Sequence, residues 1–112
     1  MHEYSIVQSL VDSVERAIGG RMASVHGIEV RIGEISGVDP ELLSTAYEVF
    51  RAGTICERAA MVIERIPARW ECPRCGGAIG AGRALRCGEC DEPARLAAGD
   101  EIVLQRIELE VA

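Results

Sequence analysis

The spacing of apolar residues predicts two amphipathic helices. From Tyr4 onward, apolar residues recur at intervals that place them on one face of a helix, and Gly19-Gly20 supplies the glycine that ends many helices. A second helix is expected to begin at Asp39-Pro40-Glu41, which combines a capping carboxylate, a proline at the first helical position and an acid in the first turn, and to close near Gly53. The apolar positions of the two helices are Ile6, Val7, Leu10, Val11, Val14 and Ile18, and then Leu42, Leu43, Ala46, Val49 and Phe50.

Three segments alternate apolar and polar residues, the pattern typical of half-buried strands. They are residues 25–35, 60–69 and 101–111. The last of these presents Gln105, Glu108 and Glu110 on its polar face, which indicates a solvated surface. Residues 91–99, which contain Pro93, are expected to form a loop.

Four cysteines form the most specific motif in the chain. They are two Cys-x-x-Cys pairs separated by eleven residues: Cys72, Cys75, Cys87 and Cys90. Each pair can fold into a tight turn with both sulfurs toward one point, and two such turns supply the four thiolates that structural zinc binds in a tetrahedron. We expect Pro73 to preset the first turn, and Gly76 and Gly88 to adopt positive φ beside the metal. Because four sulfurs leave no position open for water or substrate, the predicted role of Zn(II) is structural.

Two disulfides and an iron site are the alternatives for these cysteines. Nothing in the sequence has the pattern of a signal peptide, because Glu3 stands where a basic region is expected and polar residues interrupt the first apolar stretch. We therefore expect a cytoplasmic protein, in which thiols stay reduced. Iron can occupy a four-thiolate site, and ligand spacing alone does not separate it from zinc.

These elements predict an α+β fold, with two helices on a small three-stranded mixed sheet and an inserted zinc-ribbon-like lobe. Residues 1–69 and 99–112 are expected to form one α/β domain, and residues 70–98 a zinc-binding domain. A lobe of about thirty residues buries too little surface to fold alone, which is where a structural metal is expected.

Composition narrows the classes of partner. Hydrophobic residues make up 48% of the chain and aromatic residues 4%, so the core must be aliphatic. The formal net charge is −6, and the twelve basic residues are scattered arginines. This charge opposes binding to nucleic acid or to an anionic membrane, and no run approaches the length of a membrane span.

The N-terminus can chelate a metal ion. Histidine at position 2 places three nitrogens within reach of one ion: the Met1 α-amine, the His2 backbone amide when deprotonated, and the His2 imidazole. Glu3 is a further candidate ligand through its backbone amide or its carboxylate. Such nitrogen-rich sets suit Ni(II) and Cu(II) in square-planar geometry. The alternative is a frayed terminus without function.

No residues form a recognisable catalytic constellation, and there is no glycine-rich phosphate loop. Cys56 is interpreted as a small apolar residue, with a reactive thiol as the alternative. His26 is interpreted as a solvated or hydrogen-bonded histidine.

The sequence resembles the HypA/HybF family of hydrogenase maturation nickel chaperones over essentially the whole chain. The resemblance rests on the opening residues 1–5 (Met-His-Glu-Tyr-Ser), on residues 30–38 (Val-Arg-Ile-Gly-Glu-Ile-Ser-Gly-Val) and on the paired cysteines. It implies that His2 is the essential nickel ligand, helped by backbone nitrogens of Met1, His2 and Glu3, and that the four cysteines bind structural zinc. The first domain would then be the nickel-binding domain.

The resemblance also implies delivery of nickel to the NiFe-hydrogenase large subunit precursor together with a HypB-type GTPase, and in some organisms to urease. We expect a monomer or weak dimer. The competing hypothesis is a zinc-ribbon interaction module that binds nucleic acid or protein, which the acidic charge disfavours. An enzyme is the least favoured class, because the predicted metal site is closed.

Overall fold

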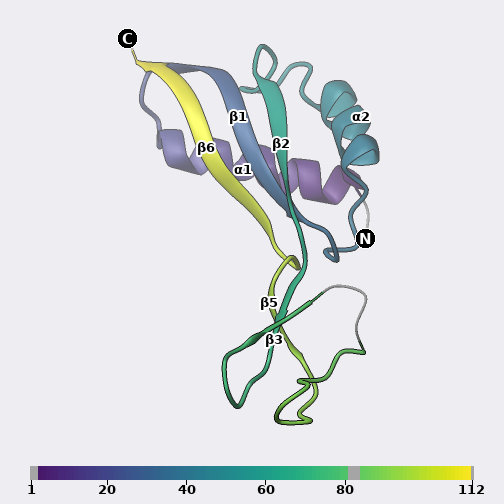
Figure 1. Ribbon diagram of the computed structural model, residues 1–112. Coiled ribbons are helices and arrows are strands. Elements are labelled where there is room, and N and C mark those ends of the chain that lie inside the picture. The colour runs from purple at the N-terminus through teal and green to yellow at the C-terminus, as the bar shows by residue number, and fades with distance from the viewer. Residues whose placement is uncertain (1–2, 81–83, 112) are drawn as a thin grey trace.

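The computed structural model describes residues 3–80 and 84–111. The molecule is elongated, with extents of 57 × 25 × 17 Å. Two helices and a three-stranded sheet form one end, and a second, smaller sheet with long loops forms the other (Figure 1). Two chain segments connect the two ends.

Helix α1 (Glu3–Ile18) has the predicted amphipathic pattern, and all six of its predicted apolar positions are buried. Gly19 and Gly20 follow at φ 59° and 83°, a backbone region that glycine enters without strain, and they end the helix as expected.

Helix α2 (Pro40–Phe50) begins at the predicted cap. The Asp39 carboxylate accepts hydrogen bonds from the backbone N–H groups of Glu41 at 2.9 Å and Leu42 at 3.4 Å. The helix ends at Phe50, and Gly53 lies in the following turn at φ 77°. Within the described residues, neither helix has the length and apolarity needed to cross a membrane.

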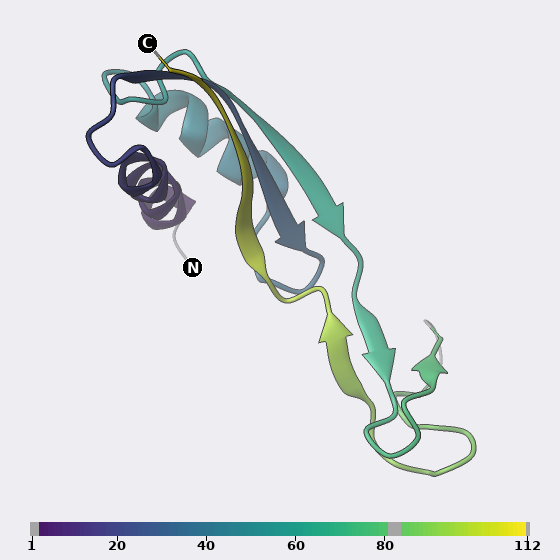
Figure 2. The same ribbon diagram turned by 90° about the vertical axis from the view of Figure 1, so that its left-hand side faces the viewer.

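Strand β1 (Ala23–Gly33) is the centre of the larger sheet, whose order is β2-β1-β6. Strand β2 (Ala60–Ile66) pairs with it in parallel and strand β6 (Ile102–Val111) in antiparallel orientation, which confirms the predicted mixed sheet. Both helices cover one face of this sheet (Figure 2). The β1 side chains that form the buried face are Val25, Ile28, Val30 and Ile32.

A buried polar contact links α2 to the start of β2. The Tyr47 hydroxyl, on a side chain only 1% exposed, donates a hydrogen bond to the carbonyl of Ala59 at 2.6 Å. The same carbonyl accepts a hydrogen bond from Arg51 Nη1 at 2.7 Å. Burial raises the pKa of the Tyr47 phenol well above its usual range, so the neutral hydroxyl persists as the donor.

The smaller sheet has the order β4-β3-β5, and the sequence did not predict it. Its strands are β3 (Arg69–Glu71), β4 (Ala78–Ile79) and β5 (Arg95–Ala98). Two expectations were therefore wrong: the second long strand ends at Ile66, and the loop expected at 91–99 contains β5. Pro67 lacks an N–H group and ends β2. Strands as short as β4 and β5 carry little local pattern and depend on β3, where Trp70 pairs with Ile79 on one side and Leu96 on the other.

Replacing Tyr47 with phenylalanine should lower the free energy of unfolding by about 1 kcal/mol, because it removes one buried donor while Arg51 still satisfies the carbonyl of Ala59. Urea denaturation followed by circular dichroism measures this. Tyr4→Phe is the matched control, since Tyr4 is 54% exposed. Equal stability of Tyr47→Phe and wild type would contradict the assigned hydrogen bond.

Candidate metal centres

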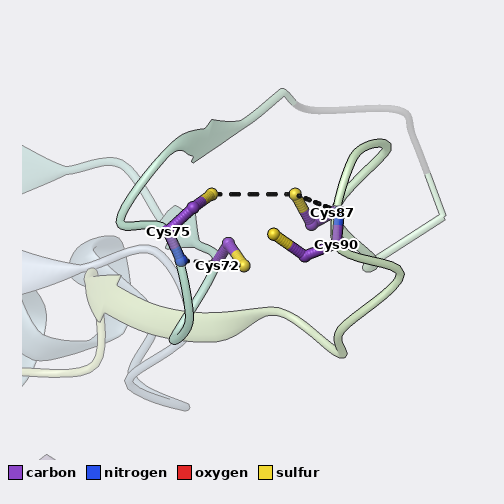
Figure 3. Close-up of side chains that lie close together, drawn as sticks. All are labelled: Cys72, Cys75, Cys87 and Cys90. Atoms are coloured by element: carbon purple, nitrogen blue, oxygen red, sulfur yellow. Dashed lines mark hydrogen bonds between the residues drawn. The ribbon is translucent and has the colours of Figure 1, made fainter.

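The part of the molecule that holds the β4-β3-β5 sheet and its loops is called the smaller lobe. Four cysteine side chains converge at its far end (Figure 3). Their sulfur atoms all lie within 4.8 Å of one another, and Cys75 Sγ lies 3.9 Å from Cys87 Sγ. An ion about 2.3 Å from each of four tetrahedral sulfurs requires sulfurs about 3.8 Å apart. The cluster therefore fits a tetrahedral zinc ion, and it leaves no side of the ion open. The cysteines that form it are Cys72, Cys75, Cys87 and Cys90.

In each Cys-x-x-Cys turn, backbone N–H groups are directed at the sulfur of the leading cysteine. In the first turn the N–H groups of Arg74 and Cys75 point at Cys72 Sγ, at 3.4 and 3.5 Å. In the second turn the N–H group of Cys90 points at Cys87 Sγ at 3.4 Å. Donors directed at sulfur stabilise the thiolate, the form that binds metal.

The residue four positions after each leading cysteine closes its turn. The N–H of Gly76 donates to the carbonyl of Cys72 at 2.8 Å, and the N–H of Asp91 donates to the carbonyl of Cys87 at 3.0 Å. Gly76 has φ 74° as predicted, and Asp91 has φ 54°. The expectation of positive φ at Gly88 was wrong, because Asp91 takes the left-handed conformation in the second turn. Aspartate tolerates this region better than most residues.

Two thiols of the cluster have pKa values shifted in opposite directions. The N–H group of Cys75 is the main cause that lowers the pKa of the Cys72 thiol to about 7. Removal from water raises the pKa of the Cys90 thiol to about 12. A bound cation must displace the remaining protons, so metal binding by this cluster is coupled to proton release.

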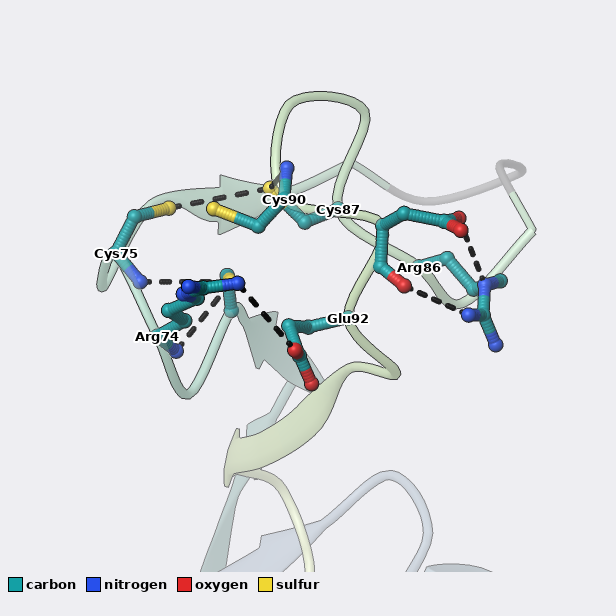
Figure 4. A network of polar contacts seen from close by, with 8 residues as sticks. Arg74, Cys75, Arg86, Cys87, Cys90 and Glu92 are labelled. Carbon is teal, nitrogen blue, oxygen red and sulfur yellow. Dashed lines mark hydrogen bonds and ion pairs between the residues drawn. The ribbon is translucent and has the colours of Figure 1, made fainter.

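One surface ion pair links the two cysteine loops, and another lies within the second loop (Figure 4). Arg74 of the first loop lies 3.8 Å from Glu92 of the second, and Arg86 Nε lies 3.1 Å from Asp91 Oδ1. These side chains are solvent-exposed, so each pair contributes little free energy. The sulfur cluster is therefore the main connection between the loops.

All five cysteines, each within the described part of the chain, are free thiols. The two-disulfide alternative thus has no support in the structure. Cys56 is fully buried beside Tyr47, and burial raises the pKa of its thiol, as expected for a packed and unreactive cysteine.

The predicted nickel ligands are only partly described. Met1 and His2 lie outside the described residues, so the predicted grouping of these two with Glu3 stays a prediction. Glu3 is described and opens α1. Its backbone N–H belongs to the first turn, where helical N–H groups have no partner within the helix. His26, the other histidine, is exposed, and its Nε2 lies 2.9 Å from Glu110 Oε2.

Comparison with known proteins gives a consistent result. Residues 1–109 match the family model described as "Hydrogenase/urease nickel incorporation, metallochaperone, hypA". The chain is 36% identical over 115 residues to the hydrogenase maturation factor HypA of Shewanella halifaxensis, covering 100% of both chains. It is 38% identical to the HypA of Wolinella succinogenes, covering 98% of this chain and 96% of that protein.

Solved structures show the same similarity. The solution structure of the Ni metallochaperone HypA from Helicobacter pylori superposes with a TM-score of 0.76 at 28% identity, and covers 100% of both chains. A second solution structure of a HypA protein superposes with a TM-score of 0.77 at 28% identity, covering 98% of this chain and 97% of that one.

Replacing Cys72 with serine should reduce zinc content from about one ion per chain to a small fraction, because a hydroxyl does not ionise to replace the thiolate. Order in the smaller lobe should be lost while the helices persist. Elemental analysis and amide NMR spectra measure both effects. Cys56→Ala is the control, because Cys56 lies outside the cluster and its loss should leave zinc in place. Unchanged zinc content in Cys72→Ser would refute the assignment.

Proposed function

This chain belongs to the HypA family of nickel-incorporation metallochaperones for hydrogenase maturation, and we propose from that membership that it binds Ni(II) at its own N-terminus. The observation that carries the proposal is that the family match begins at residue 1 and so includes Met1, His2 and Glu3. We propose that the protein hands the ion over without chemical turnover. The resemblance seen in the sequence is confirmed by these matches.

The chemistry of the N-terminus supports this site. Bound to one ion, the Met1 α-amine, the His2 amide and the His2 imidazole would form adjoining chelate rings, and these nitrogens suit Ni(II). Glu3 adds an amide or a carboxylate at the start of α1. A site with few rings and little enclosure releases its ion readily, which suits transfer better than storage.

We propose that the four cysteines hold structural Zn(II), which supplies folding free energy to the smaller lobe. The donor set and the sulfur spacing support zinc. We further propose that residues 70–98 form the zinc-binding domain, and that residues 1–69 with 99–112 form the nickel-binding domain. The separation of β4-β3-β5 from β2-β1-β6 supports that division.

We propose as partners a HypB-type GTPase and the NiFe-hydrogenase large subunit precursor, which receives the nickel. The description of the family model names urease beside hydrogenase, so urease is a second candidate recipient. The net charge of −6 argues against nucleic acid and anionic membranes as partners. We also propose a monomer or weak dimer in the cytoplasm, where thiols are kept reduced.

Replacing His2 with alanine should abolish binding of the roughly one Ni(II) per chain that the wild-type protein takes up, because the imidazole closes the nitrogen chelate. Isothermal titration with Ni(II) and elemental analysis, both on untagged protein, measure stoichiometry and affinity. His26→Ala is the matched control, since it removes the other histidine from an exposed pair with Glu110. Zinc content should be the same in all three proteins. Unchanged nickel binding in His2→Ala would disprove the proposed site.

Adding two residues before Met1 should weaken nickel binding by about tenfold or more, a change of at least about 1.4 kcal/mol, because the α-amine leaves its chelate position. The same titration measures this on a Gly-Ser extension. A C-terminal extension of the same composition is the control. Equal affinity of the N-terminally extended and native chains would remove Met1 from the ligand set.

A further inference from the structure

The two segments that connect the lobes meet at the end of β1. We call these segments, residues 67–68 and 99–100, the neck. Three consecutive N–H groups, from the last residue of β1 and the turn after it, donate hydrogen bonds of 2.8 Å to the neck and to the residues next to it: Gly33 to the carbonyl of Glu101, Glu34 to that of Ile66, and Ile35 to that of Gly99. One short piece of β1 and its following turn therefore holds both connections.

The Glu34 side chain adds a fourth contact. Its Oε1 accepts the backbone N–H of Ala68 at 2.8 Å. Within the described residues, this is the one side-chain hydrogen bond to the neck. A carboxylate acceptor makes this bond stronger than one between neutral groups.

At the neck, the backbones of three chain segments pack directly against one another. A Cβ on Gly33 would overlap the carbonyl oxygen of Gly99. A Cβ on Gly99, which has φ 109°, would lie 2.6 Å from Ala68 Cα. Three chain segments therefore lie in contact with no side chain between them, and only glycine allows this approach.

Two cavities adjoin the neck. One of about 390 Å³ lies between Arg31 and Ala98, and one of about 340 Å³ lies between Val38 and Arg65; both are lined by Pro67. The extensive packing between elements lies within each sheet, between α1 and α2, and between the helices and β2 or β6. Among residues 3–80 and 84–111, no large apolar interface fixes how the lobes are oriented, and the hydrogen bonds of the neck are the contacts that can do so.

We propose that Glu34 is a positioning residue. It sets the orientation of the zinc lobe (residues 70–98) relative to the N-terminal domain, which holds α1, α2 and the β2-β1-β6 sheet. The backbone bonds of Gly33, Glu34 and Ile35 anchor the neck at its β1 side, and the carboxylate of Glu34 fixes the Ala68 peptide on the strand that runs into the zinc lobe. The functional part of this inference rests on the proposed nickel delivery: a fixed orientation presents the nickel-binding terminus and the zinc lobe together to the recipient protein.

The test compares Glu34→Ala, Glu34→Gln and Glu101→Ala in the zinc-loaded full-length protein. Glutamine keeps an amide oxygen that can accept the Ala68 N–H. Glu101→Ala removes a carboxylate of equal charge from the same region, and within the described residues the structure records no hydrogen bond for that side chain. Residual dipolar couplings of backbone N–H groups report lobe orientation, and hydrogen exchange reports protection of the Ala68 amide.

In the wild-type protein, Glu34→Gln and Glu101→Ala, couplings from both lobes should fit a single alignment tensor. In Glu34→Ala the two lobes should require different tensors, and the Ala68 amide should exchange about tenfold faster. Zinc and nickel contents should be the same in all four proteins. A single wild-type tensor in Glu34→Ala, or the same change in Glu101→Ala, would overturn the positioning role.

Nickel transfer to the hydrogenase large subunit precursor tests the functional part. The rate should fall about tenfold in Glu34→Ala and remain at the wild-type value in Glu34→Gln and Glu101→Ala. An altered orientation with an unchanged transfer rate would overturn the role in delivery. Failure of the wild-type protein to bind nickel would refute the proposed function instead, and the dipolar couplings would still decide the role of Glu34.

Discussion

Backbone pairing along β1 is the constraint on which the rest of the molecule depends. This strand pairs with β2 on one side and β6 on the other, and its apolar face packs beneath both helices. Its last residue and the turn that follows bind the neck. Strand β1 therefore organises the core, and its last residue together with the following turn carries the smaller lobe. Glycine at position 33 follows from this double role, because β1 must approach the returning chain at Gly99 without a side chain between them.

The cysteine cluster and the proposed nickel site differ in how open they are. The cysteine cluster is closed: four sulfurs surround one point, and backbone N–H groups support them. Such a site holds structure, because no coordination position remains for exchange. The proposed nickel site is instead built from the first residues of the chain, where a free amine and a histidine are adjacent in sequence. Capture and release are easier at such a site than in an enclosed one.

The neck is the structural connection between the smaller lobe and the larger domain. A lobe of about thirty residues buries too little surface to fold easily alone, and its position relative to the helices depends on hydrogen bonds rather than on a shared core. Few contacts make an orientation sensitive to single residues. Glu34 makes two hydrogen bonds at the neck, since its backbone N–H donates to Ile66 and its carboxylate accepts from Ala68.

Local sequence determined the parts of this protein whose chemistry is contained in short segments. Helix α1 follows from its apolar spacing, α2 from the Asp39 cap, and the cysteine cluster from its spacing along the chain. The N-terminal chelate was likewise predicted from three adjacent residues, and it stays a prediction, since Met1 and His2 lie outside the described part of the structure.

Tertiary structure decided what depends on partners distant in sequence. Strand β5 forms because it pairs with the edge of β3, and a segment of four residues is too short for its apolar and polar alternation to predict a strand. The left-handed turn at Asp91 rather than Gly88 was set by closure of the second cysteine loop. The contact of Glu34 with Ala68, thirty-four positions away, appears only when two chain segments cross at the end of β1. Periodicity and spacing describe neighbours along the chain, whereas these features arise from backbone groups that meet only after folding.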